Sequence, residues 1–219
     1  MKIFLDTADT SLIEKHFKTG LIDGVTTNPT LIRKSGRDPE EVYEELISIG
    51  IRDISMEVVG DASTMAEEGK RLYGKFSQNA TIKVPCSREG ISSCKVLADY
   101  GIRVNVTLIF DAAQAILASK AGATYVSPFV GRLDDNSIAG LDLIKFINDI
   151  YNVQGVTGTK ILSASIRDVK SVSQSFAYGA DIVTMPPIVF EKMYDHVLTD
   201  KGLAQFDKDW NDVQKLVGG

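Results

Sequence analysis

The chain has 219 residues, of which 44% are hydrophobic and 24% charged, a composition typical of a soluble globular domain. Its net charge of −5 gives no basic surface for nucleic acid, and no apolar run is long enough to span a membrane. Cys86 and Cys94 do not make a disulfide framework, and Asp6 comes too early for a signal peptide, so we expect a cytoplasmic protein. The two histidines, His16 and His196, are far apart, which argues against a histidine-rich metal site.

A repeating unit runs along the chain, in which a helical pattern ends at a glycine and an apolar strand follows. The strands are predicted near residues 2–6, 24–28, 54–58, 80–84, 103–108, 124–128, 160–165 and 181–185. Strands that alternate with helices predict a parallel sheet, and eight such units favour a single (β/α)8 TIM barrel. The rival is a doubly wound open sheet, but no G-x-G-x-x-G turn follows the first strand.

Polar side chains occupy one face of seven of these strands, although parallel barrel strands are normally apolar on both faces. They are Asp6, Thr26 with Asn28, Ser55 with Glu57, Thr81 with Lys83, Asn105 with Thr107, Ser127, and Ser163 with Ser165. Because strand side chains alternate between faces, we expect the apolar faces to contact the helices and the polar faces to line the lumen. The polar residues cluster at the C-terminal strand ends, where barrel enzymes carry their active sites.

Lys83 lies in the middle of the fourth predicted strand, Thr81-Ile82-Lys83-Val84-Pro85. One interpretation is an edge strand whose lysine reaches water. The other is an amine that forms a Schiff base with a carbonyl substrate. An ordinary lysine has a pKa of about 10.4, and burial favours its neutral, nucleophilic form. The polar faces of the other strands favour the second interpretation.

The residue types near Lys83 suit this chemistry. Glu57 can shuttle protons through a water held by Thr107, and Asp6 can move the proton of a substrate hydroxyl while a carbon–carbon bond breaks. Sugar hydroxyls can be held by Asn28, Asn105 and Ser127.

Two arginines follow strand ends and suit a phosphate group. Guanidinium groups bind phosphate through paired hydrogen bonds, which favours this role for Arg132 and Arg167 over that of solvated surface residues. Ser165 can add a hydroxyl to the same group.

Five short motifs are spread along the chain. They are Phe4-Leu5-Asp6-Thr7, Gly24-Val25-Thr26-Thr27-Asn28-Pro29, Lys83-Val84-Pro85 with Glu89-Gly90, Ser127-Pro128-Phe129-Val130-Gly131-Arg132, and Ala164-Ser165-Ile166-Arg167. With them the chain resembles, along essentially its whole length, the transaldolase family, in particular its short members, which include fructose-6-phosphate aldolase. The resemblance implies a Schiff base on Lys83, acid–base catalysis by Asp6, and a catalytic water held by Glu57 with Thr107. It implies no metal or organic cofactor, and it implies that the substrate is bound by Thr26, Asn28, Asn105, Ser127, Phe129, Arg132, Ser165 and Arg167.

The expected reaction transfers a dihydroxyacetone unit from sedoheptulose 7-phosphate to glyceraldehyde 3-phosphate, giving erythrose 4-phosphate and fructose 6-phosphate, as in the pentose phosphate pathway. One alternative is a fructose-6-phosphate aldolase, which releases free dihydroxyacetone. In the aldolase branch, glutamine and tyrosine stand at the positions of Glu57 and Phe129, so this chain resembles the transferring branch more closely. An alternative of another class is a sugar-phosphate-binding barrel without catalysis.

Residues 1–199 are predicted to form the catalytic barrel, and residues 200–219 an extra C-terminal helix. Apolar residues recur in this segment at spacings of three and four, a helical stripe for which the barrel core has no place. They are Leu203, Phe206, Trp210, Val213 and Val217. One interpretation is a helix folded over the bottom of its own barrel. By resemblance to the short transaldolases, the helix packs instead on a neighbouring subunit, in pentamer rings paired as decamers, so we expect a large homo-oligomer.

Overall fold

The computed structural model describes residues 1–217 and shows a closed barrel of eight parallel strands. In chain order the strands are β1 (Lys2–Asp6), β2 (Gly24–Thr26), β3 (Ile54–Glu57), β4 (Ala80–Pro85), β5 (Val104–Ile109), β6 (Tyr125–Pro128), β7 (Lys160–Ser163) and β8 (Ile182–Met185). Each strand pairs with the next one along the chain, and β8 closes the barrel against β1. The predicted (β/α)8 fold is confirmed.

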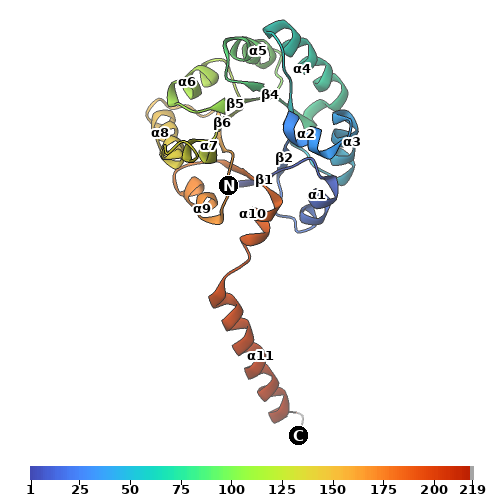
Figure 1. Cartoon of the computed structure of the whole chain (residues 1–219), viewed down its shortest axis with the longest axis vertical. Helices are drawn as coiled ribbons and strands as arrows, with labels where there is room; N and C mark the ends of the chain where they lie inside the picture. The colour runs from blue at the N-terminus through green and yellow to red at the C-terminus, as the bar shows by residue number, and fades with distance from the viewer. Residues whose placement is uncertain (218–219) are drawn as a thin grey trace.

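Helices surround this barrel, except for the last one, which stands away from it (Figure 1). They are α1 (Thr10–Phe17), α2 (Pro29–Ser35), α3 (Pro39–Ile49), α4 (Ala62–Phe76), α5 (Arg88–Asp99), α6 (Ala112–Lys120), α7 (Val130–Asp134), α8 (Gly140–Val153), α9 (Val169–Ala177), α10 (Pro187–Lys192) and α11 (Val197–Val217). Among them, α3, α6 and α9 begin at an aspartate cap, because Asp38, Asp111 and Asp168 accept hydrogen bonds from the backbone N–H groups at the starts of these helices.

The apolar core lies between the strands and the helices. Leu5, Ile54 and Val104 from the strands are fully buried, as are Leu46 of α3 and Leu97 of α5. These strand residues alternate with the lumen-facing ones, so the outward face of the sheet supplies the apolar contact that holds the helices in place.

Side chains also fill the half of the lumen near the N-terminal strand ends. Phe4 enters the lumen beside Gly24, where a Cβ atom would lie 2.6 Å from the Phe4 ring and 2.7 Å from the Asp53 carbonyl oxygen. Glycine is therefore the residue that this close approach of three strands allows. The apolar cluster around Phe4 contains Tyr125, Leu162, Ala164 and Ile182.

A buried polar network lies at the same end of the barrel. Asp53 accepts hydrogen bonds from the Thr81 hydroxyl at 2.7 Å, from the Arg103 guanidinium at 2.7 Å and from the Tyr125 hydroxyl at 2.6 Å. Burial and the Asp53 carboxylate raise the pKa of Tyr125, so its hydroxyl stays a donor to Asp53. Together with the Phe4 cluster, this network closes the lumen at its N-terminal end.

The expectation that every polar strand face points into the lumen is wrong for β7. The Ser163 hydroxyl points outward and hydrogen-bonds the Ser175 hydroxyl of α9 at 2.9 Å. Leu162 and Ala164 point inward and join the apolar lumen cluster. The inversion is possible because a serine that finds a partner on a helix can be buried on the outer face at little cost.

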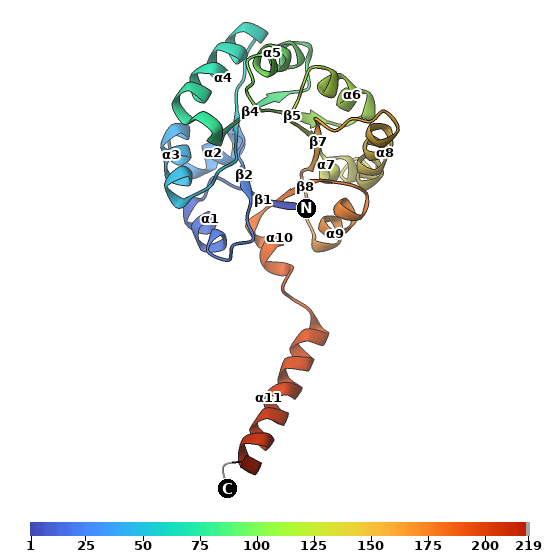
Figure 2. The same cartoon turned by 180° about the vertical axis from the view of Figure 1, so that it is seen from behind.

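The C-terminal helix α11 stands away from the barrel, as both views show (Figures 1 and 2). It begins at Val197 rather than at residue 200, and none of its residues is buried. Phe206 and Trp210 are 71% and 63% exposed. The helix does not fold over its own barrel, so that interpretation is wrong; residues 218–219 of the predicted segment lie outside the described residues. Over residues 1–217, no helix is long and apolar enough to cross a membrane.

Candidate active site

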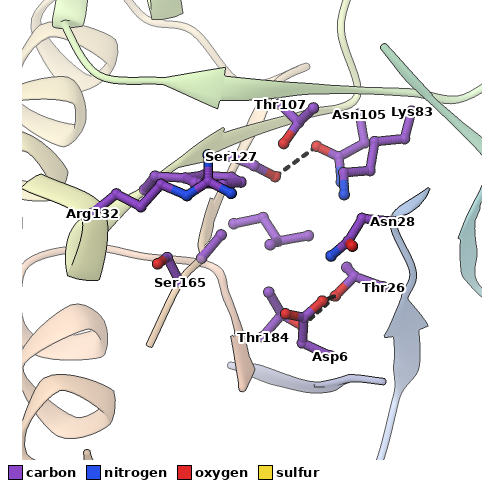
Figure 3. Close-up of a pocket in the computed structure, with 13 residues that line it drawn as sticks. Asp6, Thr26, Asn28, Lys83, Asn105, Thr107, Ser127, Arg132, Ser165 and Thr184 are labelled. Atoms are coloured by element: carbon purple, nitrogen blue, oxygen red, sulfur yellow. Dashed lines mark hydrogen bonds between the residues drawn. The ribbon is translucent and has the colours of Figure 1, made fainter. Parts of the chain in front are cut away.

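A pocket opens at the C-terminal ends of the strands (Figure 3). Every residue predicted for the site lines this pocket except Glu57 and Arg167, which are considered below. Leu162, Ala164 and Thr184, which were not predicted from the sequence, line it as well. The lining residues are Asp6, Thr26, Asn28, Lys83, Asn105, Thr107, Ser127, Phe129, Arg132, Leu162, Ala164, Ser165 and Thr184.

Lys83 is buried in the lumen, with 5% of its surface exposed. Its ammonium nitrogen lies 3.0 Å from the Glu57 carboxylate and donates a hydrogen bond to the Thr27 carbonyl oxygen at 2.9 Å. Strand β4 pairs with β3 on one side and β5 on the other, so the edge-strand interpretation of this lysine is wrong. Glu57 is thus placed behind Lys83 as its charged partner rather than on the pocket wall.

The neighbouring strand β5 contributes a polar chain beside Lys83. The Asn105 side chain accepts a hydrogen bond from the Ser127 hydroxyl at 2.7 Å and donates to the Ser55 hydroxyl at 3.2 Å. The Thr107 hydroxyl is buried and finds no hydrogen-bond partner among residues 1–217, although it lines the pocket. A buried hydroxyl without a partner is costly, so Thr107 has hydrogen-bonding capacity for a molecule in the pocket.

Asp6 is held by the Thr26 hydroxyl of β2, which in turn contacts the Thr184 hydroxyl of β8. Thr26 donates a hydrogen bond to Asp6 Oδ1 at 2.8 Å, and its hydroxyl also lies 2.6 Å from that of Thr184 (Figure 3). Burial raises the pKa of Asp6, and the charge of Lys83 opposes that shift. Asp6 is therefore a carboxyl group that takes up a proton more readily than an ordinary aspartate.

Thr184 could have been found from the sequence, because it is the one polar residue in the otherwise apolar strand β8, Ile182–Met185. It is 2% exposed, and its side chain alternates with the outward-facing Val183. Polar faces were predicted for seven strands, but not for β8.

Asn28 serves both the fold and the pocket. Its side-chain oxygen caps α2 by accepting a hydrogen bond from the Leu31 N–H at 2.9 Å. The amide NH2 group is left to donate into the pocket, which Asn28 lines. The capping bond fixes the direction of that donor.

Arg132 and Ser165 lie on the opposite side of the pocket from Lys83 and Asn28 (Figure 3). The Arg132 guanidinium lies over the Phe129 ring, 4.9 Å from its centroid. Ser165 follows strand β7 and adopts a left-handed backbone conformation with φ of 58°. This side of the pocket is cationic, whereas the side near Asp6 carries a carboxylate, so the two ends of the pocket suit different parts of one ligand.

Arg167 does not line this pocket. Its guanidinium makes a bidentate ion pair with Asp135, one bond of which is 2.5 Å long. The two side chains are 54% and 48% exposed. Arg167 borders a second, adjoining pocket that also contains Ser165, so it lies beside the main pocket without facing it.

The arrangement brings a buried amine, two carboxyl groups and several neutral hydrogen-bonding groups to one enclosed place. An amine can attack a carbonyl carbon, and the carboxyl groups can accept and return protons. Within residues 1–217, no group of three or more His, Cys, Asp and Glu side chains is suited to a metal ion.

Comparison with known proteins gives a consistent result. A family model described as "Transaldolase/Fructose-6-phosphate aldolase" matches residues 3–217. A protein of Caulobacter vibrioides (strain NA1000 / CB15N) named "Probable transaldolase" is 52% identical over 211 residues, which cover 96% of each chain. A "Probable transaldolase" of Paracoccus denitrificans (strain Pd 1222) is 51% identical over 219 residues, covering 99% of this chain and 100% of the relative. One of Roseobacter denitrificans (strain ATCC 33942 / OCh 114) is 51% identical with the same coverage.

Proposed function

We propose, since the chain belongs to the transaldolase/fructose-6-phosphate aldolase family, that it is a class I transaldolase of the pentose phosphate pathway. It transfers a dihydroxyacetone unit from sedoheptulose 7-phosphate to glyceraldehyde 3-phosphate and leaves erythrose 4-phosphate and fructose 6-phosphate. The observation that carries the proposal is the buried Lys83 amine, 3.0 Å from Glu57 in a pocket lined by hydroxyl and amide groups.

The reaction begins when the Lys83 amine attacks the ketone carbon of the donor sugar. The Glu57 carboxylate takes the proton that the ammonium group must lose, and it returns a proton when water leaves and the imine forms. Thr107 holds the water of this step with its free hydroxyl, which supports its assignment as a catalytic residue.

Asp6 acts at the carbon–carbon bond. Its carboxylate takes the proton of the hydroxyl on the carbon that leaves as an aldehyde, and the bonding electrons move into the imine to form an enamine. The hydrogen bond from Thr26 keeps Asp6 in place, and the raised pKa suits a group that holds this proton until the acceptor arrives. The enamine then attacks the acceptor aldehyde, Asp6 returns the proton to the new hydroxyl, and water hydrolyses the imine.

The remaining pocket residues bind and orient the substrate. The hydroxyl groups of the dihydroxyacetone unit are held by Thr26, Asn28, Asn105 and Ser127, with Phe129 against the sugar chain. Arg132, Ser165 and Arg167 bind the phosphate. The separation of Arg132 and Ser165 from Lys83 across the pocket supports this division, because a sugar phosphate is extended and carries its phosphate away from the ketone (Figure 3).

Borohydride trapping tests the assignment of Lys83. Borohydride reduces an imine to a stable amine, so treatment in the presence of fructose 6-phosphate should inactivate the enzyme and add mass to the peptide that contains Lys83. Lys83→Ala should show neither effect. A label on a different lysine, measured by peptide mass spectrometry, would overturn the assignment.

One observation favours the aldolase alternative: the description of the matching family model names both activities. Glu57 and Phe129 favour transfer, because a phenyl ring cannot donate a proton to the enamine carbon. Assaying fructose 6-phosphate with and without erythrose 4-phosphate separates the two activities. Release of free dihydroxyacetone as fast as transfer would replace the transaldolase assignment by the aldolase. The names of the relatives weigh against a barrel without catalysis.

We further propose a homo-oligomer in which α11 packs on a neighbouring subunit. The helix leaves its own barrel (Figure 2). Its apolar side chains Leu203, Phe206 and Trp210 are exposed. Burying this stripe against a second copy would remove a large apolar surface from water. A cytoplasmic location accords with the two cysteines, Cys86 and Cys94, which are both free.

A further inference from the structure

The ion pair between Arg167 and Asp135 occupies a group that the proposed function needs elsewhere. Both Nη nitrogens of Arg167 bind the two carboxylate oxygens of Asp135. This paired edge is the one that guanidinium groups use to bind phosphate oxygens. Arg167 therefore cannot present the same edge to Asp135 and to a substrate phosphate at once.

Of the three aspartates that border the second pocket, Asp135 is the one that accepts hydrogen bonds from Arg167. Two further aspartates border the same pocket, but each has a role in the fold. Asp134 accepts a hydrogen bond from the N–H of Gly140 at 2.9 Å. Asp168 caps α9 by accepting bonds from the N–H and the hydroxyl of Ser171, both at 2.8 Å. Asp135 is therefore distinguished by its partner rather than by its charge alone.

The Arg167 side chain lies next to the main pocket, against Gly131. A Cβ atom on Gly131 would lie 2.2 Å from the Ser165 carbonyl oxygen, 2.9 Å from Arg167 Nε and 3.2 Å from Ser165 Oγ. Arg167 and the Ser165 hydroxyl thus both lie against Gly131, which has no side chain, and the next residue along the chain is Arg132. Ser165 borders both pockets, so the Arg167 guanidinium in the second pocket is next to the Ser165 side of the first.

The pair with Asp135 is weak enough to be exchanged. About half of each side chain is exposed, at 54% and 48%. An ion pair this exposed contributes little to stability, because water screens it and two long side chains lose conformational freedom when they form it. A phosphate dianion that also contacts Arg132 and Ser165 can therefore take Arg167 from Asp135.

We propose that Asp135 is a positioning residue that holds Arg167 in the free enzyme and competes with the substrate phosphate for its guanidinium. The competition weakens phosphate binding and speeds its release. This suits a transferase that must let one aldose phosphate leave before the next one binds. The inference rests on the proposed function in that the anion is the phosphate of a sugar.

Calorimetric titration with inorganic phosphate tests this proposal without requiring turnover. Asp135→Asn removes the competing charge and should bind phosphate about two- to fivefold more tightly than the unaltered enzyme, the upper part of the range expected for loss of one exposed charge pair. Asp134→Asn is the matched control, since it removes the same charge one residue away, and it should change the affinity less than twofold. In Asp135→Asn with Arg167→Gln, the gain should disappear, because the gain acts through Arg167.

Steady-state kinetics provides a second readout that a purely structural defect would not reproduce. Asp135→Asn should lower KM for fructose 6-phosphate by a factor similar to the gain in phosphate affinity, whereas misfolding would lower kcat. Unchanged or weaker phosphate binding by Asp135→Asn overturns the proposal, as does a gain that persists without Arg167. If the enzyme shows the expected phosphate pattern but transfers no dihydroxyacetone, the proposed function falls and this inference stands. If the enzyme transfers dihydroxyacetone but does not show the phosphate pattern, this inference falls and the proposed function stands.

Discussion

Replacing Glu57 by glutamine removes the charged partner of the lysine at the centre of the site. The Glu57 and Lys83 side chains are 13% and 6% exposed, and their charged atoms lie 3.0 Å apart. Removing one member of a buried pair leaves the other charge without compensation, which typically costs about 3–5 kcal/mol of folding stability.

Two contacts reduce this cost. Lys83 keeps its hydrogen bond to the Thr27 carbonyl oxygen, and the glutamine oxygen can still accept a bond worth about 1 kcal/mol. The Asp6 carboxylate also stays close enough to interact with the lysine charge. We therefore expect Glu57→Gln to lower the free energy of unfolding by about 2–3 kcal/mol, a large share of the ~5–15 kcal/mol that stabilises a typical domain.

Equilibrium unfolding in urea measures this loss, with the free energy extrapolated to water. Glu14→Gln is the control, because it makes the same change in an exposed pair with Lys18, for which less than about 1 kcal/mol is expected. Combining Glu57→Gln with Lys83→Met should recover part of the loss, since no unpaired charge then remains. A cost for Glu57→Gln no larger than that of the control would refute the reasoning.

Three further predictions concern other parts of the molecule. Phe129→Tyr places an acidic hydroxyl in the pocket and should raise release of free dihydroxyacetone relative to transfer. A tenfold change in this ratio needs only about 1.4 kcal/mol of activation free energy. Adding Glu57→Gln should increase the effect. An unchanged product ratio would contradict this. Because burial raises the pKa of Asp6, the folded state loses stability as pH rises above the unfolded value of about 4, so Asp6→Asn should raise the unfolding temperature at pH 7 but not below pH 4. Equal unfolding temperatures at pH 7 would argue against a buried carboxylate. Truncation after Asp195 should shift the protein to smaller species in light scattering, and a full-length chain that is monomeric at micromolar concentration would exclude the proposed role of α11.

The barrel and most of its lumen could be predicted because parallel strands have a strict alternation of faces. Once Lys83 was placed on the inner face of β4, its equivalents on β3 and β5 followed by the same rule, and Glu57 and Asn105 do pair with it in register. The helix starts were equally predictable, because an aspartate before a helical pattern acts locally through its own backbone neighbours.

Features that depend on distant partners were not predictable from alternation. Ser163 and Ser175 satisfy each other across the strand–helix interface, so polarity alone assigned Ser163 to the wrong face. Thr184 joins the site through Thr26, which is far away in the sequence. Arg167 was expected in the phosphate site, but its pairing with Asp135 depends on how the segment after β6 packs beside the segment after β7.

Because the lumen is closed at its N-terminal end, substrates and products must enter and leave at the C-terminal strand ends. The Phe4 cluster and the Asp53 network fill the barrel beneath Lys83, so the pocket opens at the C-terminal strand ends. In the proposed reaction, the aldose phosphate released by bond cleavage would leave through the opening by which the acceptor enters, and both phosphates would bind at that opening. We therefore expect ping-pong kinetics, with parallel lines in double-reciprocal plots. At high concentration the acceptor should occupy the free enzyme and inhibit competitively against the donor.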